Sequence, residues 1–596
     1  MARLTTFSRI LLTLLIVGGV AAAVYYFGPG IKIGTSKQLE GIKVSDSDVN
    51  NVVTTAELPV PSTQVSTKVT SRPLVRIGAY AWNAQSGIIA ANGGPRTTAG
   101  SRMEQNGVNL EIIRQDWLSE LRNLQMKFVE ELDRGTPNPK NGVFAVMIMG
   151  DGAPYYISST QQALDDKYGK GRYSLQVVGC VGLSYGEDKL IGPPKWKLDP
   201  STMKGALISA VMGDGDWVTA VNYAFANGLP VNPDPATYDP GAVNFYPSAN
   251  DDYIESAKEL IKSQREGWTI QLKEVVAGKL TGRTVDKKVD GCATWTPGDK
   301  MVFDELTGFT DIISTREFNN QMATTIIAVK EWAEANAGTV SNILKSAFEA
   351  ANQMKQYDSW RRKAAACVAS TYQLENADYW YAMFQGQRGE KGGISYNMGG
   401  SRVFNLADAN QYYGLTDGIN RYQAVYDQVS FYLKELNPAG FNQNVSRIVP
   451  YQEAVNLSFL KNVRGIDEGQ AYSSDYSQSA NKVMASGEWL INFNTGRATI
   501  RPEAGDVLNQ IYNLVVQAED AKLELIGHTD NTGNRDDNYS LSVARAEAVK
   551  TYLMQKGIPA SRFQKVDGKG QDEPVADNGT PAGKARNRRV VIVLKK

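Results

Sequence analysis

The chain contains a single histidine, His528, and the residues around it are the first candidates for chemistry. An acidic, Asn-rich stretch, 530–537, follows it. A zinc site here would have no second histidine and no nearby cysteine, and the stretch lacks the glycine at the sixth position and the glutamate at the twelfth that a calcium loop requires. The segment Gly-Leu-Ser-Tyr-Gly (182–186) has the spacing of a nucleophile elbow, but its base would have to be His528, far along the chain. We therefore expect His528 to close a strand and to do no catalysis.

Asp530 and Arg545 form a more informative pair. Asp530 follows a predicted strand, 521–527, and Arg545 flanks the apolar stripe of a predicted helix, so both can face one loop. Asn538 lies near the start of that helix, where a side-chain amide can cap backbone N–H groups. A carboxylate accepts from an ammonium while a guanidinium forks onto a carboxylate, so the pair is typical of a receptor for a zwitterion. A plain Asp530–Arg545 salt bridge, worth about 0–1 kcal/mol if exposed, fits the same spacing.

The elements that position this pair form a small α/β domain over residues 487–596. The pattern is a βαβαβ layout in two layers. It predicts a strand at 489–493, a helix at 502–518, a strand at 521–527, a helix at 538–556, a short strand near 563–567 and a strand at 588–595. The small, polar residues 466–486 before this domain are typical of a linker.

Four segments of this domain resemble the OmpA-like peptidoglycan-binding domain over residues 488–596. They are GHTDNTG (527–533), NYSLSVARAEAVKTYLMQKGIPASRF (538–563), GKGQDEPVADN (568–578) and ARNRRVVIVL (585–594). The resemblance implies non-covalent binding of peptidoglycan through the diaminopimelate of its stem peptide. It places the family's Asp and Arg on Asp530 and Arg545. It places Thr529 and Asn538 in the same pocket, and Arg588 or Arg589 beside it.

Two Gly-Asp-Gly turns stand out in the middle of the chain. One contains Gly150 and Asp151, and the other contains Asp214 and is followed by Asp216. A glycine-rich turn before a helix can bind an anion, but aspartates there cap the same N–H groups and repel anions. The aspartates are therefore either helix caps or parts of a site whose charge stays open.

Apolar runs alternate with helical periods from Leu74 onward, which predicts βαβ units and a mainly parallel sheet. Strands near 173–183 and 309–316 connect two such blocks and suggest two lobes with a double crossover. The pairs Trp82 with Asn83 and Thr294 with Trp295 follow strands and could line a cleft between the lobes.

Residues 72–465 resemble a type II periplasmic substrate-binding protein of the nitrate/sulfonate/taurine-like class. The segments that carry this resemblance are VGLSYGEDKLIGPPKW (181–196), GDGDWVTAVNYAFANG (213–228), GCATWTPGDKMVFDE (291–305) and ISTREFNNQMATTIIAVKEW (313–332). The resemblance implies one lobe over about 72–178 and 310–465, a second over about 179–309, and a small-molecule solute in the cleft. Lobes that serve only as a spacer or docking platform fit the same pattern.

The amino terminus has the features of a membrane anchor. Arg3 and Arg9 precede residues 10–27, which carry no charge and would span about 27 Å as a helix. A cleaved signal peptide is the alternative, since three alanines follow the apolar run. We expect residues 1–9 in the cytoplasm, a single-pass helix at 10–27 in the inner membrane, and the bulk of the chain in the periplasm. Residues 28–71 are rich in Ser, Thr and Val and predict a flexible linker.

Composition narrows the function classes. Sixty-three basic residues balance sixty-three acidic ones, so no global field attracts nucleic acid. No nucleophile, base and orienting group occur together, and we expect neither an enzyme nor a cofactor. The predicted fold class is α/β: a transmembrane helix, a two-lobed binding-protein domain and an OmpA-like sandwich. The leading hypothesis is an anchored Gram-negative envelope protein that binds peptidoglycan, and the alternative is a solute receptor of ABC-transporter type tethered to the cell wall.

Overall fold

The computed structural model describes residues 40–41, 55–437, 441–494 and 496–596. The predicted cytoplasmic segment 1–9, the predicted membrane helix 10–27 and most of the predicted linker 28–71 lie outside these ranges. Within them, no helix is both long and apolar enough to cross a membrane. The anchor therefore stays a prediction from the sequence.

The first lobe is built on a six-stranded sheet. Its strands, in spatial order, are β17 (Ser401–Val403), β5 (Leu175–Ser184), β14 (Ala323–Val329), β4 (Ala145–Met149), β2 (Leu74–Ala79) and β3 (Asn109–Arg114). Every residue of β4 and β14 is buried, which requires cover on both faces of the sheet. The strands β2, β3 and β4 are parallel, but β14 returns antiparallel to both β4 and β5. The sheet is thus mixed where the sequence predicted a mainly parallel one, because β14 re-enters from the second lobe.

Helices cover this sheet. The longer ones are α3 (Ser86–Asn92), α5 (Leu118–Asp133), α6 (Ala153–Tyr168), α12 (Ala337–Gln356), α13 (Asp358–Tyr372), α14 (Ala377–Gln385), α15 (Leu406–Tyr412) and α16 (Arg421–Leu436). The short ones are η2 (Asn83–Gln85), α4 (Arg102–Gln105), α11 (Lys330–Ala335), α17 (Phe441–Asn444), α18 (Tyr451–Ala454) and α19 (Ser458–Lys461). A small sheet of β1 (Glu40–Gly41), β15 (Gln387–Lys391) and β16 (Ile394–Met398) flanks the lobe.

The second lobe has a five-stranded sheet. Its strands, in spatial order, are β13 (Thr310–Ser314), β6 (Lys189–Gly192), β12 (Gly291–Thr294), β7 (Leu207–Ala210) and β9 (Asn244–Pro247). Its helices are α7 (Lys195–Leu198), η3 (Pro200–Met203), α8 (Gly215–Ala226), η4 (Ala249–Asp251), α9 (Tyr253–Glu266) and α10 (Gly298–Glu305). An outlying sheet consists of β8 (Thr237–Tyr238), β10 (Ile270–Val276) and β11 (Lys279–Lys287). The chain crosses between the lobes after β5 and again after β13, as the predicted double crossover requires.

Residues 55–71, which the composition assigns to the flexible linker, pack on the first lobe instead. The carbonyl of Leu58 accepts from the indole N–H of Trp360 at 2.8 Å, and its N–H donates to Gln353 at the same distance. Val69 is buried. Composition alone misses this packing because the partners lie about 300 residues away.

The carboxyl-terminal domain, residues 483–596, has a four-stranded sheet. Its strands, in spatial order, are β18 (Val483–Trp489), β21 (Val590–Lys595), β19 (Lys522–Gly527) and β20 (Phe563–Gly568). Its helices are η6 (Pro502–Ala504), α20 (Gly505–Gln517), α21 (Arg535–Gln555), η7 (Ala560–Arg562) and α22 (Pro581–Asn587). The predicted strand at 489–493 is wrong, because β18 pairs with β21 and begins inside the predicted linker. The helix α22 was not predicted.

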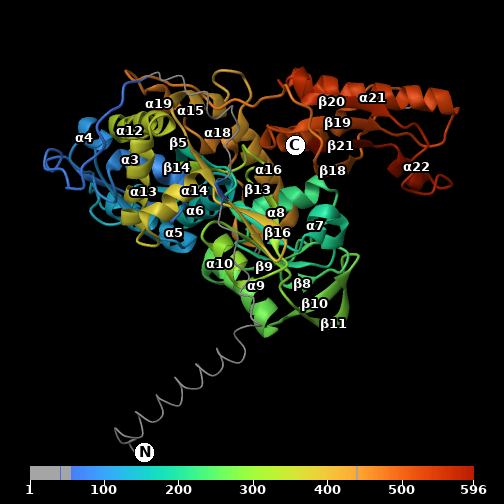
Figure 1. The fold of residues 1–596 in the computed structure, drawn as a ribbon, viewed down its shortest axis with the longest axis horizontal. Helices are drawn as coiled ribbons and strands as arrows, with labels where there is room; N and C mark the ends of the chain where they lie inside the picture. The colour runs from blue at the N-terminus through green and yellow to red at the C-terminus, as the bar shows by residue number, and fades with distance from the viewer. Residues whose placement is uncertain (1–39, 42–54, 438–440, 495) are drawn as a thin grey trace, which may run out of the picture.

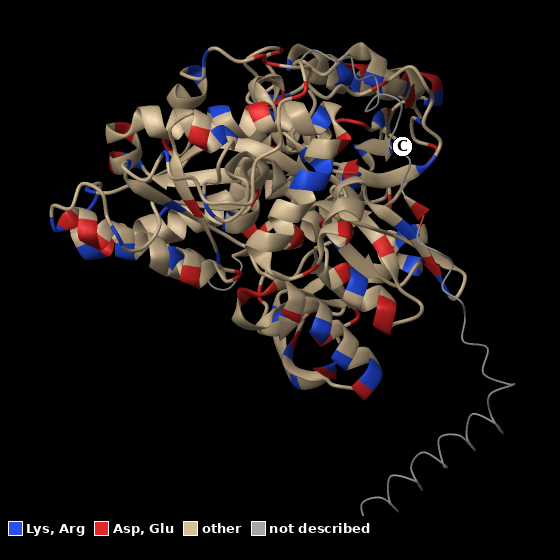
Figure 2. Cartoon of the chain, turned by 60° about the vertical axis from the view of Figure 1, so that its left-hand side comes forward, with Lys and Arg blue, Asp and Glu red and all other residues tan. Residues whose placement is uncertain are grey.

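The carboxyl-terminal domain packs directly against both lobes (Figure 1). Glu519, after α20, forms an ion pair at 2.6 Å with Arg421 at the start of α16 in the first lobe. Gln517 accepts from Asn222 of α8 in the second lobe at 2.8 Å. Figure 2 shows acidic and basic residues interspersed along the visible ribbon, as the even charge balance suggests.

Candidate functional site

The loop after β19 is held by two backbone hydrogen bonds. The N–H of His528 donates to the carbonyl of Arg589 at 2.9 Å, and the N–H of Thr529 donates to that of Gly570 at 2.8 Å. These bonds tie the loop to the strand β21 and to the segment after β20. These bonds therefore fix the position of the backbone at Asp530.

Glycines let the helix α21 approach the sheet closely. A Cβ on Gly527 would lie 2.0 Å from the backbone oxygen of Ser542, and one on Gly568 would lie 2.1 Å from the Ser542 hydroxyl. Any side chain at these positions would push the helix away. Because Arg545 follows Ser542 by one turn, this close packing carries its guanidinium toward the loop of Asp530.

Asp530 has an arginine partner, but it is Arg588 and not Arg545. One carboxylate oxygen accepts from Arg588 Nη1 at 2.7 Å, and the other accepts from the backbone N–H of Thr532 at 2.9 Å. Burial opposes ionisation, but the hydrogen bonds from Arg588 and Thr532 hold the pKa of Asp530 below its ordinary value. Asp530 is thus a carboxylate throughout the neutral range.

Arg545 is 4% exposed, and among the described residues it forms no ion pair. Its Nε donates to the carbonyl of Arg497 at 3.3 Å, and its guanidinium lies 5.0 Å from the ring centre of Phe493. Burial and the charge of Arg588 lower the pKa of Arg545, while the charge of Asp530 raises it. A buried guanidinium next to a second cation, with no carboxylate of its own, favours an anionic group from outside the protein.

The other predicted residues divide into two groups. Thr529 is 4% exposed, and its buried hydroxyl has no hydrogen-bond partner in the described part of the chain. Asn538 donates to the carbonyl of Asp530 at 3.3 Å and to Gln571 at 2.7 Å, and so holds the loop. It does not cap α21, because the helix begins three residues earlier and Asn534 accepts from the N–H of Asp537.

Arg588 and Arg589 point to different neighbours. Arg588 reaches Asp530, as described above, and is about half exposed. Arg589 is buried, donates to the carbonyl of Glu573 at 3.2 Å and lies 3.1 Å from the carboxylate of Glu488. Arg588, which caps the carboxyl end of α22 just before β21, is therefore the arginine that faces the site, and Arg589 supports the fold behind it.

His528 lies in this supporting layer. It is 2% exposed, and burial followed by the charge of Arg589 lowers its pKa to about 4. The imidazole is neutral at neutral pH, which fits a residue that closes a strand.

A second group of predicted residues meets between the two lobes. Asp151 follows β4 of the first lobe, and Asp214 and Asp216 follow β7 of the second. A Cβ on Gly152 would lie 1.6 Å from an Asp214 oxygen, so the two Gly-Asp-Gly turns are in contact across the lobes. Asp214 caps α8 through the N–H of Gly215 at 2.9 Å, as the cap interpretation predicts, but Asp216 caps nothing.

The remaining cleft candidates lie in two different places. The indole of Trp82 donates to Asp188 at 3.1 Å, and the backbone N–H of Asn83 donates to Glu187 at 3.1 Å. Trp295 is buried at the same place. Thr294 instead turns into the second lobe, where its hydroxyl donates to the carbonyl of Tyr253 at 2.9 Å.

Gly150 is a packing position in the first lobe. A Cβ there would lie 2.4 Å from the Thr325 hydroxyl, and its N–H donates to the carbonyl of Ala323 at 2.7 Å.

Sequence reasoning missed five members of this group. They are Glu187, Asp188, Lys189, Asp299 and Gln321, all of them buried. The run Glu-Asp-Lys at 187–189 was a visible signal, since it places three charges at the first crossing between lobes.

Comparison with known proteins assigns a family to the carboxyl-terminal domain. A model described as OmpA family matches residues 492–588. The peptidoglycan-binding protein ArfA of Mycobacterium tuberculosis (strain ATCC 25618 / H37Rv) is 37% identical over 117 residues, or 20% of this chain and 35% of ArfA. The probable lipoprotein YiaD of Escherichia coli (strain K12) is 36% identical over 104 residues, or 17% of this chain and 47% of YiaD. The chain thus spans between about a third and a half of the length of these relatives.

Among solved structures, the periplasmic nitrate-binding protein NrtA from Synechocystis PCC 6803 is similar over 66% of this chain and 88% of its own. The identity is 9% and the TM-score 0.44, which says nothing about a ligand. The sequence resemblance of the last domain is confirmed: residues 492–588 of this chain form an OmpA family domain.

Proposed function

We propose that this chain is a cell-envelope protein that binds peptidoglycan non-covalently through Asp530 and Arg545. The observation that carries the proposal is the buried Arg545, which has no ion pair among the described residues and lies close enough to Asp530 for its pKa to respond. Arg545 would take the carboxylate of a diaminopimelate residue, and Asp530 would take the ammonium on the same carbon. The similarity to ArfA, whose name gives peptidoglycan binding, supports this assignment.

The remaining residues have supporting roles in this proposal. The exposed Arg588 neutralises Asp530 and would share it with, or yield it to, the incoming ammonium. Thr529 offers a free hydroxyl at the loop, and Asn538 keeps the loop in place. Residues 10–27 would anchor the chain in the inner membrane, with the described domains in the periplasm. The proposed function is binding without catalysis, and the neutral His528 has no catalytic role in it.

Retention on purified sacculi tests this proposal. Arg545→Ala should reduce retention roughly ten- to hundredfold, because a hydrogen-bonded charge contributes about 1.5–3 kcal/mol. The matched control is Arg535→Ala, which removes an exposed arginine of the same helix that pairs with Asp572. Unchanged retention by a folded Arg545→Ala protein would refute the assignment.

A second candidate function is a solute receptor that the wall-binding domain only localises. The observation that favours it is the contact of the two Gly-Asp-Gly turns across the lobes, with polar side chains buried around them. A spacer needs no buried polar group between its lobes, and burying one without a partner destabilises the fold.

A further inference from the structure

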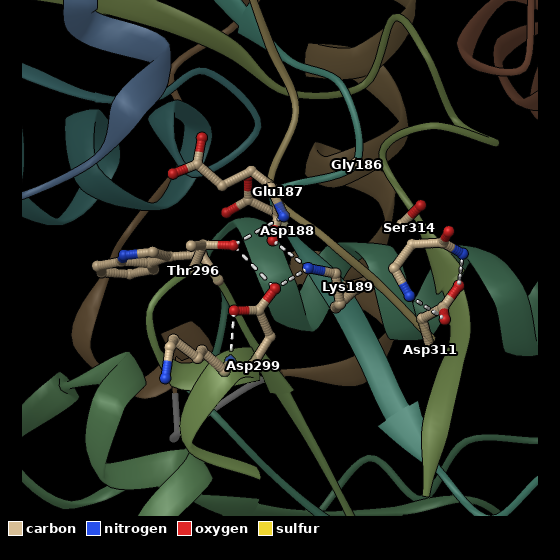
Figure 3. Close-up of polar contacts among 12 residues, drawn as sticks. Gly186, Glu187, Asp188, Lys189, Thr296, Asp299, Asp311 and Ser314 are labelled. Atoms are coloured by element: carbon tan, nitrogen blue, oxygen red, sulfur yellow. Dashed lines mark hydrogen bonds and ion pairs between the residues drawn. The ribbon is translucent and has the colours of Figure 1, made fainter. Parts of the chain in front are cut away.

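Six carboxyl groups gather where the two lobes meet, and we call them the interlobe cluster. They belong to Asp151, Glu187, Asp188, Asp214, Asp216 and Asp299, and none is more than 1% exposed. In the described part of the chain, their one ion pair joins Asp299 to Lys189, which also donates to the carbonyl of Glu187 at 2.9 Å. Figure 3 shows Lys189 directed at Asp299, with Asp188 and Glu187 nearby. Among the described residues, Lys189 is therefore the one basic side chain that forms an ion pair with any of the six carboxyl groups.

Both lobes and the crossings between them contribute to the cluster. Burial raises the pKa of Asp216, and the nearby charges of Asp188, Asp151 and Asp214 raise it further. Gln321, on the second crossing, donates to Asp151 at 2.8 Å. The carboxyl groups are thus close enough to interact, although they come from segments far apart in the chain.

Several polar atoms of the cluster have no hydrogen-bond partner within the described residues. Both carboxylate oxygens of Asp216 are unpaired, as are one oxygen of Asp151 and one of Glu187. The side-chain amide of Asn83, next to Glu187, is also unpaired. A buried carboxylate without donors is strongly unfavourable, so these oxygens call for donors that the protein itself does not supply.

Protonation is the protein's own way to relieve this excess of acid. Burial raises the pKa of Asp188 to about 7 and that of Asp214 to about 6, and it raises those of Asp151 and Asp216 well above the ordinary value. A bound cation with N–H donors would relieve the same repulsion without protonation of the carboxyl groups. An anion such as nitrate or a sulfonate would find no free basic group here among the described residues and would be repelled by each carboxyl group that is ionised.

Aromatic rings surround the acids. Tyr80 stacks on Trp295 with ring centres 5.5 Å apart, Tyr253 lies 4.0 Å from Trp295, and Trp82 lies 6.1 Å from Tyr80. Aromatic faces attract organic cations. A metal ion fits less well, because no group of three or more potential ligands in the described ranges is arranged to hold one.

We propose that the interlobe cluster binds a small organic cation with one or more alkylammonium groups. The inference rests on the candidate role of the lobes as a solute receptor and is independent of peptidoglycan binding. Ammonium N–H groups would donate to Asp216 and Asp151, and the alkyl part would lie against Trp295 and Tyr80. The lobes would then discriminate against anionic solutes by charge.

Thermal unfolding of the full chain tests this proposal with putrescine and spermidine as probes. Nitrate, ethanesulfonate and sodium chloride at equal ionic strength serve as comparisons. At least one amine should raise Tm progressively with concentration, following RT ln(1 + [L]/Kd), and the comparison solutes should not. Titration calorimetry with the responding amine then gives Kd directly.

Asp216→Asn should weaken binding of that amine at least tenfold without lowering the Tm of the protein alone, because it removes an unpaired buried charge. The matched control is Asp286→Asn, an exposed aspartate on β11 of the same lobe, which should leave Kd unchanged. Equal loss in both variants, or full binding by Asp216→Asn, would overturn the site.

The two levels of the proposal fail in different ways. If nitrate or ethanesulfonate raises Tm and no amine does, the ligand class is wrong and the receptor stands. If no solute raises Tm, both are wrong and the lobes are a spacer. Retention on sacculi is measured separately and is unaffected by either result.

Discussion

The OmpA family domain and the interlobe cluster both place aspartates near backbone turns, but they balance charge in opposite ways. Asp530 is paired with Arg588, and its pKa is lowered. Asp216 has no partner in the described ranges, and its pKa is raised. In the first site Arg588 already neutralises Asp530, and the guanidinium of Arg545 has no ion pair among the described residues. In the second site carboxyl groups outnumber basic groups. The difference predicts ligands of different charge: a zwitterion at one site and a cation at the other.

Raising the pH should separate the two regions most strongly. Groups whose pKa is raised in the folded protein stabilise it below their unfolded pKa, and this stabilisation is lost as the pH rises through the folded pKa. Above pH 6.5, Asp188 should therefore reduce stability until the pH passes its folded pKa of about 7, and Asp151 and Asp216, whose pKa values are raised well above the ordinary one, should add to the decrease. The slope is about 1.4 kcal/mol per pH unit for each proton involved. Denaturant unfolding at a series of pH values measures it.

Two other groups define the window and the control for this experiment. His528, with a lowered pKa of about 4, acts in the opposite direction, but only below about pH 6.5, where it would charge in the unfolded chain. Asp530 has a lowered pKa and stays ionised, so retention on sacculi should not change between pH 6.5 and 8. Asp216→Asn should flatten the stability slope. A slope that is flat in the unmodified protein would contradict the charge imbalance.

Glycine substitutions should show that one region is rigid and the other adjustable. Gly527→Ala sets a methyl group against the backbone of Ser542 and should destabilise the domain by about 1–3 kcal/mol. Gly152→Ala meets the end of the Asp214 side chain and keeps an allowed backbone at φ −75°, so it should cost less stability. Its main effect should be a weaker response to amines, because Asp214 must move. Tm and amine Kd for both variants distinguish these outcomes, and equal losses of Tm would contradict the distinction.

The sequence predicted the parts of these sites that are local in the chain. The strand before Asp530, the helix of Arg545 and the two Gly-Asp-Gly turns all follow from short-range patterns. The pairing of Asp530 with Arg588 could not be predicted, because it depends on β21 lying beside β19.

Long-range packing also explains the other failures. Glu187 and Asp188 became site residues only because the crossing after β5 lies between the lobes. The edge strand β18 (Val-Met-Ala-Ser-Gly-Glu-Trp) does not alternate apolar and polar residues, so its sequence shows no strand period, and its pairing with β21 defines it.

The two regions are joined by a chain of buried amides, which predicts a small coupling between them. Asn222 donates to Gln517 of the carboxyl-terminal domain at 2.8 Å and to Gln321 at 3.0 Å, and Gln321 donates to Asp151. Gln517→Ala would leave Asn222 short of an acceptor and loosen the amide that orients Asp151. We expect amine Kd to rise about two- to fivefold, which corresponds to about 0.5–1 kcal/mol of coupling.

Calorimetry on Gln517→Ala, with exposed Gln555→Ala as the control in the same domain, measures this coupling. Retention on sacculi should stay unchanged in both variants, because neither glutamine is among the residues that contact Asp530 or Arg545. An unchanged amine Kd in Gln517→Ala would mean that the carboxyl-terminal domain and the lobes work independently despite their contact. A loss equal to that of Asp216→Asn would mean that docking of the carboxyl-terminal domain is required to form the interlobe cluster.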